Sequence, residues 1–300
     1  MSISVRHLTK YYGNQAAIDN ISFKADKGEI LGFLGPNGAG KSTTMKIITG
    51  FIPQSSGEVE VCGMNIKTTP LETRKRIGYL PESNPLYSDM YVKEFLSFIG
   101  RIYKISNRNK RINEVIELVG LEREQQKKIG QLSKGYQQRV GLAQAIIHDP
   151  EVLILDEPTS GLDANQLDDI RGLIKNLGKE KTVMLSTHIM QEVEAICDRI
   201  VIIKNGVIVA NDNMQSLQFD KKNQVIYVEF DGNVSRNQLN QLDLVNKVKE
   251  ITNNAFIIES KSEIDLKKYI AQYAKDNNLL IVTLRVEEKS IEEVFKALTK

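Results

Sequence analysis

The segment GPNGAGKST, residues 35–43, has the residue types and spacing of a loop that binds a polyphosphate. Gly35 is followed after four residues by Gly40, Lys41 and Ser42, as in a phosphate loop whose backbone N–H groups surround the phosphates. Lys41 would reach the β- and γ-phosphates, and the Ser42 hydroxyl would bind Mg²⁺. We therefore expect a nucleotide to contact the whole loop, namely Gly35, Pro36, Asn37, Gly38, Ala39, Gly40, Lys41, Ser42 and Thr43.

The residues on either side of the loop support this interpretation. GEILGFL before it is short and apolar, as expected of a buried parallel strand, and STTMKIITG after it has apolar residues at helical spacing. The loop then lies where a strand meets the positive end of a helix, which favours an anion. A glycine-rich turn without function is the alternative, and this context disfavours it.

Two acidic residues follow the apolar run VLIL and could serve phosphoryl transfer. Asp156 and Glu157 could mark only the solvent end of a sheet, but a phosphate loop lies upstream. Asp156 would hold Mg²⁺ as a hard oxygen ligand. Glu157 would polarise the attacking water as general base.

Composition excludes several classes of protein. The 300 residues include 40 basic and 38 acidic side chains, a net charge of +2 with no long basic block, so we expect no nucleic-acid partner. Cys62 and Cys197 are too few for a disulfide framework or a cysteine metal site and suit a reducing compartment. No apolar run reaches the roughly 18 residues needed to span a bilayer, and the N-terminus is too polar for a signal peptide. We expect a soluble, cytoplasmic chain.

The elements that must position these residues form an α/β pattern over residues 1–213. Strand signals occur at residues 3–8, 17–25, 57–63 and 76–80, and β/α alternation resumes after Gly130 with EVLILD, TVMLST and RIVIIKNGVIVA. This alternation predicts a mainly parallel sheet covered by helices. Between the two parts, at about residues 84–150, apolar positions at helical spacing predict a helical subdomain.

From about Met214 the chain becomes rich in Asn, Gln, Lys and Glu and loses glycine loops, so residues 214–300 are predicted to form a small second α+β domain. Its strand signals are VIYVEF, AFIIES and LLIVTLRV. Its helix signals are NQLNQL, residues 262–277 and a last helix with a capping box from Ser290 to Glu293.

Four further motifs decide among the enzymes that use a phosphate loop. LSKGYQQRV (132–140), VLILDEP (152–158), SGLD (160–163) and STH (186–188) follow in this order, and together they resemble the ATP-binding subunits of ABC transporters. LSKGYQQ resembles the signature motif of that family, LDEP its Walker B strand end, SGLD its D-loop and His188 its switch histidine. The resemblance covers residues 1 to about 210 and implies an ABC-type P-loop ATPase fold with ATP and Mg²⁺ as cofactors.

The resemblance also assigns roles to single residues. It implies that Tyr12 stacks on adenine, although a tyrosine near a strand end is commonly plain packing, and that His188 contacts the γ-phosphate. Ser133 is on local grounds only an N-cap, but with Gly135 it matches the helix start that faces the ATP of a partner subunit. Glu82 stands where many members have a glutamine that contacts Mg²⁺, which makes the implied metal ligands Ser42, Glu82 and Asp156.

The departures from the common pattern point to export. Lys134 and Tyr136 replace residues of the common form LSGGQ, and such variants resemble the branch that serves ABC-2 type exporters. Within that branch, the segment of residues 78–96 is most similar to ATP-binding components associated with gliding motility in Bacteroidetes. The implied partners are separate ABC-2 type membrane permease subunits and a second ATP-binding subunit, in a homodimer or pseudo-dimer on the cytoplasmic face of the inner membrane. The aromatic helix face from Tyr91 to Tyr103 would be partly core and partly the docking edge for a helix of the permease.

Two other hypotheses stay open. A soluble ABC-type ATPase of translation or DNA repair is disfavoured by the single ATP module, the absence of a long coiled coil and the absence of a basic stripe. A catalytically silent partner that only binds ATP is disfavoured by Glu157 and His188.

Overall fold

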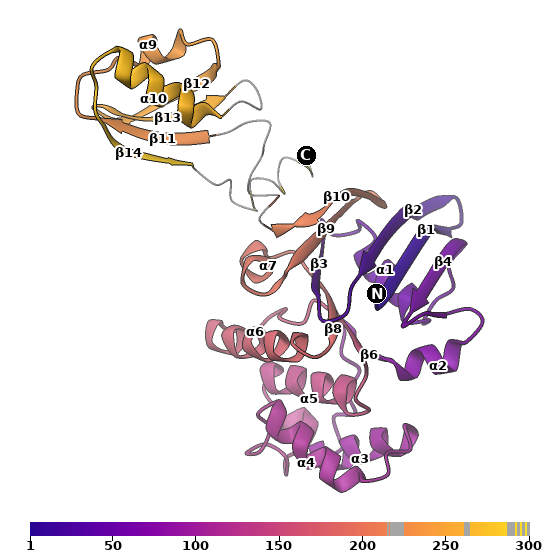
Figure 1. The fold of residues 1–300 in the computed structure, drawn as a ribbon. Coiled ribbons are helices and arrows are strands. Elements are labelled where there is room, and N and C mark those ends of the chain that lie inside the picture. Colours follow the sequence, from indigo (N-terminus) through magenta and orange to yellow (C-terminus); the bar gives the residue numbers. More distant parts are fainter. Residues whose placement is uncertain are drawn as a thin grey trace. The chain divides into compact units, whose positions relative to one another are not determined.

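The computed structural model describes residues 1–214, 216, 225–260 and 265–286, and the single residues 292, 295 and 298. The chain divides into two compact units (Figure 1). The first contains Met1–Met214, and the second contains residues 225–260 and 265–286.

A six-stranded sheet forms the centre of the first unit, in the order β10-β9-β3-β8-β7-β6. Five neighbouring strands are parallel and β10 is antiparallel at one edge. The bounds are β3 (Ile30–Leu34), β6 (Ile77–Leu80), β7 (Val152–Asp156), β8 (Thr182–Thr187), β9 (Arg199–Lys204) and β10 (Val207–Asn213). Every residue of β3, β7 and β8 is buried, as expected where helices cover both faces of a parallel sheet. The predicted α/β fold with a mainly parallel sheet is confirmed.

The first unit also contains an antiparallel sheet. The sequence pattern predicted its longer strands but did not distinguish this sheet from the central one. Its order is β2-β1-β4-β5, with β1 (Ile3–Tyr12), β2 (Gln15–Ala25), β4 (Ser56–Val61) and β5 (Met64–Asn65). Helix α1 (Lys41–Ile48) contacts strands of both sheets and buries Met45, Ile47 and Ile48 in the core that the sheets share. The helix that follows the phosphate loop is thus held on both sides. The short helix α2 (Pro70–Lys75) leads from β5 to β6.

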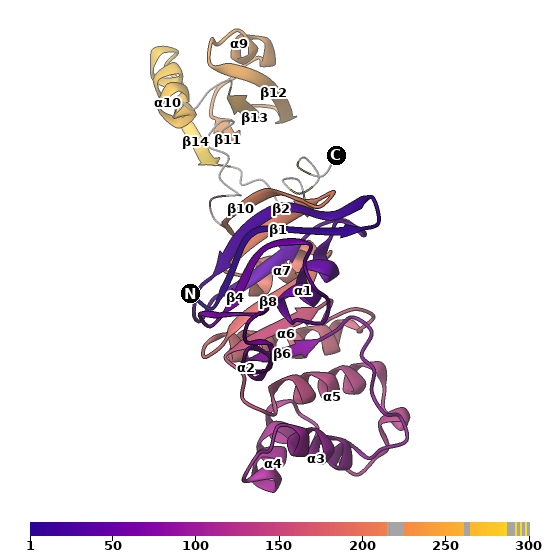
Figure 2. The same cartoon turned by 90° about the vertical axis from the view of Figure 1, so that its right-hand side faces the viewer.

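The helical part of the first unit consists of α3 (Val92–Ile102), α4 (Arg108–Leu118), the short 3₁₀ helix η1 (Ile129–Gln131) and α5 (Lys134–Ile146). Helix α5 contacts α3, α4 and the edge strand β6, so it joins the helices to the central sheet (Figures 1 and 2). On α3, Phe95 and Ile99 are buried while Phe98 and Ile102 are exposed. The aromatic face is therefore divided between core and surface, as the sequence predicts. Helices α6 (Ala164–Gly178) and α7 (Met190–Ile196) follow β7 and β8.

The second unit has the element order β11 (Val225–Phe230), α9 (Arg236–Asn240), β12 (Val245–Thr252), β13 (Ala255–Ser260), α10 (Leu266–Asp276) and β14 (Ile281–Val286). Its antiparallel sheet has the order β12-β13-β11-β14, which is the ferredoxin-like β-α-β-β-α-β arrangement. Leu239 of α9 and Ile270 of α10 share one core with β11 and β13, so both helices cover the same face. The predicted small α+β unit is confirmed.

The prediction for the second unit missed β12. This edge strand buries only Val245 and Val248, so its sequence lacks the alternation that marks a half-buried strand. Of the predicted helix at 262–277, α10 begins at Leu266, and residues 262–264 lie outside the described residues. The predicted capping box of Ser290 and Glu293 also lies outside them.

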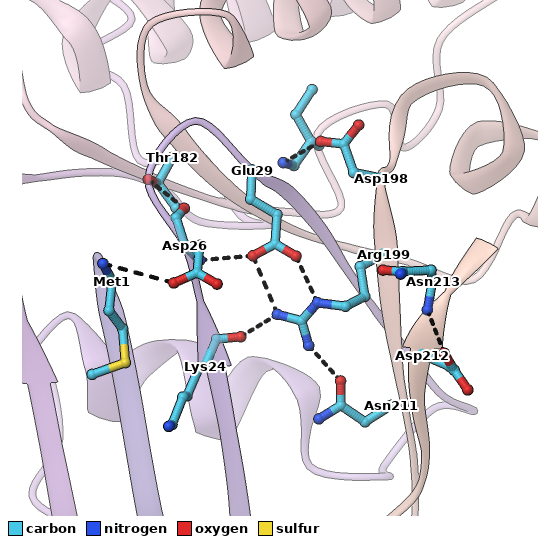
Figure 3. A network of polar contacts seen from close by, with 11 residues as sticks. Met1, Lys24, Asp26, Glu29, Thr182, Asp198, Arg199, Asn211, Asp212 and Asn213 are labelled. Atoms are coloured by element: carbon cyan, nitrogen blue, oxygen red, sulfur yellow. Dashed lines mark hydrogen bonds and ion pairs between the residues drawn. The ribbon is translucent and has the colours of Figure 1, made fainter. Parts of the chain in front are cut away.

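A polar network closes one end of the first unit's sheets (Figure 3). Arg199 at the start of β9 donates through Nε to Glu29 Oε1 at 2.6 Å and through Nη2 to Glu29 Oε2 at 3.2 Å, a bidentate pair. The same guanidinium also donates to the carbonyl of Lys24 and to the side chain of Asn211. Next to it, Asp198 Oδ2 accepts from the backbone N–H of Ile30 at 2.8 Å. The network joins β2, β10 and the start of β3, which leads into the phosphate loop.

Candidate functional site

The glycines of the phosphate loop are required by close backbone approaches. A Cβ on Gly35 would lie 2.3 Å from the carbonyl oxygen of Ile203, and one on Gly40 would lie 2.6 Å from that of Ala17. Gly40 also has a φ of 109° and Gly38 a φ of 79°, a region that favours glycine. The loop therefore keeps its shape because its glycines pack directly against β9 and β2.

The ammonium group of Lys41 lies inside the loop. Its Nζ donates to the carbonyl oxygens of Gly35 at 2.7 Å and Pro36 at 3.3 Å, and the residue is buried. Both hydrogen-bond partners are neutral carbonyl groups, so neither competes with an anionic ligand for Lys41 Nζ. This is the position from which a lysine can bind the phosphates of a nucleotide.

A chain of hydrogen bonds joins the start of α1 to the ends of β7 and β8. Ser42 Oγ donates to Asp156 Oδ1 at 3.1 Å, and Ser186 Oγ donates to the same oxygen at 2.6 Å. Ser186 Oγ in turn accepts from the backbone N–H of Glu157 at 2.9 Å. Ser186 belongs to the STH motif, but the sequence pattern predicted no role for it. Its position at the end of a predicted strand beside the acidic pair is the signal that could have found it.

Glu157 is held in an unusual conformation beside His188. It has a φ of 50°, rare for a residue with a side chain, and its Oε2 lies 2.9 Å from His188 Nδ1. Burial raises the pKa of the Glu157 carboxyl, and the charges of His188 and Lys41 oppose this shift. A carboxyl with a raised pKa, next to a lysine and a histidine at the end of a strand, has the environment of a general base.

The remaining predicted site residues lie elsewhere. Ser133 caps α5, where its Oγ accepts from the backbone N–H of Tyr136, and the side chain of Gln166 of α6 packs against Gly135. Tyr12 is exposed at the β1–β2 turn, with Lys10 Nζ 5.1 Å from its ring centre. Glu82 is exposed after β6. Burial is the main cause of the raised pKa of Tyr79, and the negative charges of Asp156 and Glu82 add to it. The structure thus brings together Lys41, Ser42, Asp156, Glu157 and His188, whereas Ser133 and Gly135 contact Tyr136 and Gln166 instead.

Comparison with known proteins identifies this arrangement. Residues 18–160 match the ABC transporter family. The bacitracin transport ATP-binding protein BcrA of Bacillus licheniformis is 35% identical over an alignment of 308 positions, which covers 98% of this chain and 95% of BcrA. This chain belongs to the ATP-binding subunits of ABC transporters.

Other members of this family match about 70% of the chain. The Nod factor export ATP-binding protein I of Burkholderia lata is 37% identical over 210 residues, 68% of each chain. The ATP-binding cassette MJ0796, solved as a dimer in a post-hydrolysis state with ADP and Pi, superposes with a TM-score of 0.65 at 27% identity, covering 71% of this chain and 98% of that one. As a member of the family, the chain is an ATPase that hydrolyses ATP for transport, and the predictions of fold and enzyme class are confirmed.

The signature helix of this ABC subunit is tied to the loop after β7. Gln138 Nε2 donates to the carbonyl of Pro158, the residue after Glu157, at 2.8 Å. The Lys134 side chain lies against Gly161, where a Cβ would meet Nζ at 2.1 Å. Sequence reasoning gave Gln138 no role, because nothing local marks its partner. Among the residues that the structure describes, none of the helices combines the length and the hydropathy needed to cross a bilayer.

Proposed function

We propose that two ATP-binding subunits of this kind, in a homodimer or a pair of related chains, hydrolyse Mg²⁺-bound ATP to power export through separate ABC-2 type permease subunits. The observation that carries the catalytic part is the pair of contacts at one end of the sheet, Ser42 Oγ to Asp156 Oδ1 at 3.1 Å and His188 Nδ1 to Glu157 Oε2 at 2.9 Å. The Ser42–Asp156 pair suits a metal ion, and the His188–Glu157 pair suits an attacking water.

The residues at the loop fit Mg²⁺. Mg²⁺ prefers oxygen donors and is held by few protein ligands, with water and phosphate oxygens completing its shell. The Ser42 hydroxyl and the Asp156 carboxylate supply two such oxygens within hydrogen-bond distance of each other. Glu82 is our proposed third oxygen, because its charge acts on Tyr79 together with that of Asp156. When bound, the metal neutralises charge on the β- and γ-phosphates.

The side chains around the metal divide the reaction among them. Lys41 binds the β- and γ-phosphates and stabilises the charge that develops on them. Glu157 accepts the proton of the attacking water, and burial raises its pKa toward a range suited to that task. His188 holds the Glu157 carboxyl through Nδ1, which leaves Nε2 for the γ-phosphate. Tyr12 supplies the ring against which adenine stacks.

A second subunit completes the site in this proposal. Ser133 and Gly135 start a helix of 13 residues with no acidic residue in its first turn, and such a helix end favours an anion. This helix start packs on Gln166 rather than on the chain's own phosphate loop. We therefore assign Ser133 and Gly135 to the ATP bound by the partner, which supports the dimer that the family resemblance implies.

The surface for the permease is a groove beside the helical part. A cavity of about 460 Å³ lies between the loop after α1, strand β6 and the ends of α3 and α5. Phe51 and Ile102 line it and are 74% and 59% exposed, which is unusual for large apolar side chains. We propose that an amphipathic helix of the permease binds here, which places this subunit on the cytoplasmic face of the inner membrane. Tyr87 and Tyr91 are also exposed, and the Tyr87 ring packs edge-on against Phe98 of α3.

Export rather than import follows from the relatives, because the Nod factor protein is named for export. A role in gliding motility remains a prediction from residues 78–96. Co-purification from detergent-solubilised membranes tests the proposal: the wild-type chain should retain a polytopic protein, and Ile102→Glu should lose it while keeping ATP binding. Leu71→Glu, an equally exposed apolar residue that does not line the cavity, is the control. If no membrane protein accompanies the wild-type chain, the alternative of a soluble ABC-type ATPase gains support.

A further inference from the structure

We infer that Glu192 is a positioning residue for His188 and acts through the hydroxyl of Thr187. The inference rests on the proposed role of His188. Neither Thr187 nor Glu192 is expected to touch nucleotide or metal. Both are almost completely buried, and Thr187 directly precedes His188 in the chain.

The Thr187 hydroxyl holds the backbone on both sides of His188. Its Oγ1 accepts from the backbone N–H of Ile189 at 3.1 Å and donates to Glu192 Oε2 at 2.6 Å. A hydroxyl has one proton, so the bond to Glu192 fixes its direction and leaves the lone pairs for the N–H of Ile189. The turn from β8 into α7, which carries His188, is therefore oriented by one side chain of the following helix.

Packing alone does not explain why Glu192 occupies this position. The residue is 1% exposed, and its second oxygen, Oε1, is buried without a hydrogen-bond partner among the described residues. A buried polar atom without a partner destabilises the fold, whereas an apolar side chain of similar size would carry no such cost. What an apolar side chain cannot do is accept the hydrogen bond of Thr187, so the acceptor is the property of Glu192 that the site uses.

Accurate placement of His188 is important because its ring contacts the catalytic carboxyl. His188 Nδ1 lies 2.9 Å from Glu157 Oε2, and the His188 side chain is more than half exposed, with little packing to hold it. The backbone turn therefore determines where the imidazole lies. A displacement of about 1 Å in a reacting group can reduce a rate by up to 100-fold.

Two matched pairs of variants test the inference in the full-length chain. Glu192→Leu and Thr187→Val each remove the hydrogen bond between these two side chains. Glu192→Gln keeps an acceptor oxygen, and Thr187→Ser keeps the hydroxyl. We expect the first pair to lower kcat by about 10-fold with a KM for ATP within about 2-fold of wild type, since the phosphate loop is untouched. The second pair should retain at least half of the wild-type kcat.

The double variant Thr187→Val/Glu192→Leu should be no slower than the slower single variant, because both changes remove the same interaction. Wild-type kcat in Glu192→Leu or Thr187→Val overturns the inference. It is also overturned if Glu192→Gln falls as far as Glu192→Leu, or if KM rises together with the loss of kcat, since either result indicates only a structural role. His188→Ala separates the two proposals: wild-type kcat in that variant refutes the proposed role of His188 itself.

Discussion

His188 Nδ1 lies 2.9 Å from Glu157 Oε2, and this contact joins the ends of two neighbouring parallel strands, β8 and β7. The two side chains approach because Ser186, also at the end of β8, binds the backbone N–H of Glu157. A glutamine at position 157 would keep a hydrogen-bonding oxygen toward His188 but could not accept a proton from water. The single substitution Glu157→Gln should therefore separate ATP hydrolysis from ATP binding.

Glu157→Gln should bind ATP like wild type and lose hydrolysis by at least about 100-fold, because the general base is removed. With hydrolysis blocked, ATP should hold two subunits together, and gel filtration with ATP and Mg²⁺ should show a dimer. Glu180→Gln, at an exposed acid between α6 and β8 that belongs to none of the motifs, is the control. Hydrolysis at the wild-type rate in Glu157→Gln would exclude this residue from the mechanism.

Lys41→Ala should lose affinity for the nucleotide itself, because a charge-assisted contact to the phosphates is worth about 1.5–3 kcal/mol, or roughly 10-fold or more in Kd. Lys46→Ala removes a lysine from the last turn of the same helix and should bind ATP normally. Titration with a fluorescent ATP analogue measures both. Equal affinity in the two variants would contradict the assignment of the loop.

Glu82→Gln should retain most of the ATPase activity, because an amide oxygen can replace a carboxylate oxygen as a ligand of Mg²⁺. Glu82→Ala should shift the Mg²⁺ dependence of the rate to higher concentration, by about 3- to 10-fold, more than it weakens ATP binding. Mg²⁺ titrations with and without the permease subunits would show whether coupling also depends on this residue. A Glu82→Ala variant that behaves like wild type in both settings would make Glu82 a surface residue without function.

His148 should make the stability of the chain depend on pH. Its ring stacks on Tyr103 at 3.9 Å, and burial lowers its pKa from 6.5 to about 4. The unfolded chain therefore binds a proton between pH 6.5 and 4 that the folded chain does not bind, so stability is present above pH 6.5 and is lost as the pH falls through this range.

Urea unfolding at pH 7 and pH 5 tests this effect. Between these pH values the free energy of unfolding should fall by about 1–2 kcal/mol more in wild type than in His148→Gln. His7→Gln, which replaces an exposed histidine, is the control. Equal pH dependence in wild type and His148→Gln would show that His148 is not the group responsible.

A chain that ends after Met214 should fold and bind ATP, because β10 ends at Asn213 and all nucleotide motifs precede it. The truncation removes Leu298, which groups with the first unit, so a small loss of stability is expected. Thermal unfolding and ATP titration check both statements. An insoluble product, or one that cannot bind ATP, would mean that the first unit needs the rest of the chain.

The features that depend on local spacing could be predicted from the amino-acid sequence. The loop from Gly35 to Thr43, the acidic pair at the end of an apolar strand and the α/β alternation are all visible within short windows, because each requires particular residue types at neighbouring positions. The order of the motifs then led to the ABC transporter subunits.

Only the tertiary structure decided which of these residues meet. Ser186 lies 30 positions from Asp156, and it reaches that carboxylate because β7 and β8 are neighbours in the sheet. Likewise, Gly135 packs against Gln166 of α6 instead of the phosphate loop. Hydrogen bonds between side chains far apart in the sequence have no local signature, because they depend on strand order and register, and those are set by packing of the whole core.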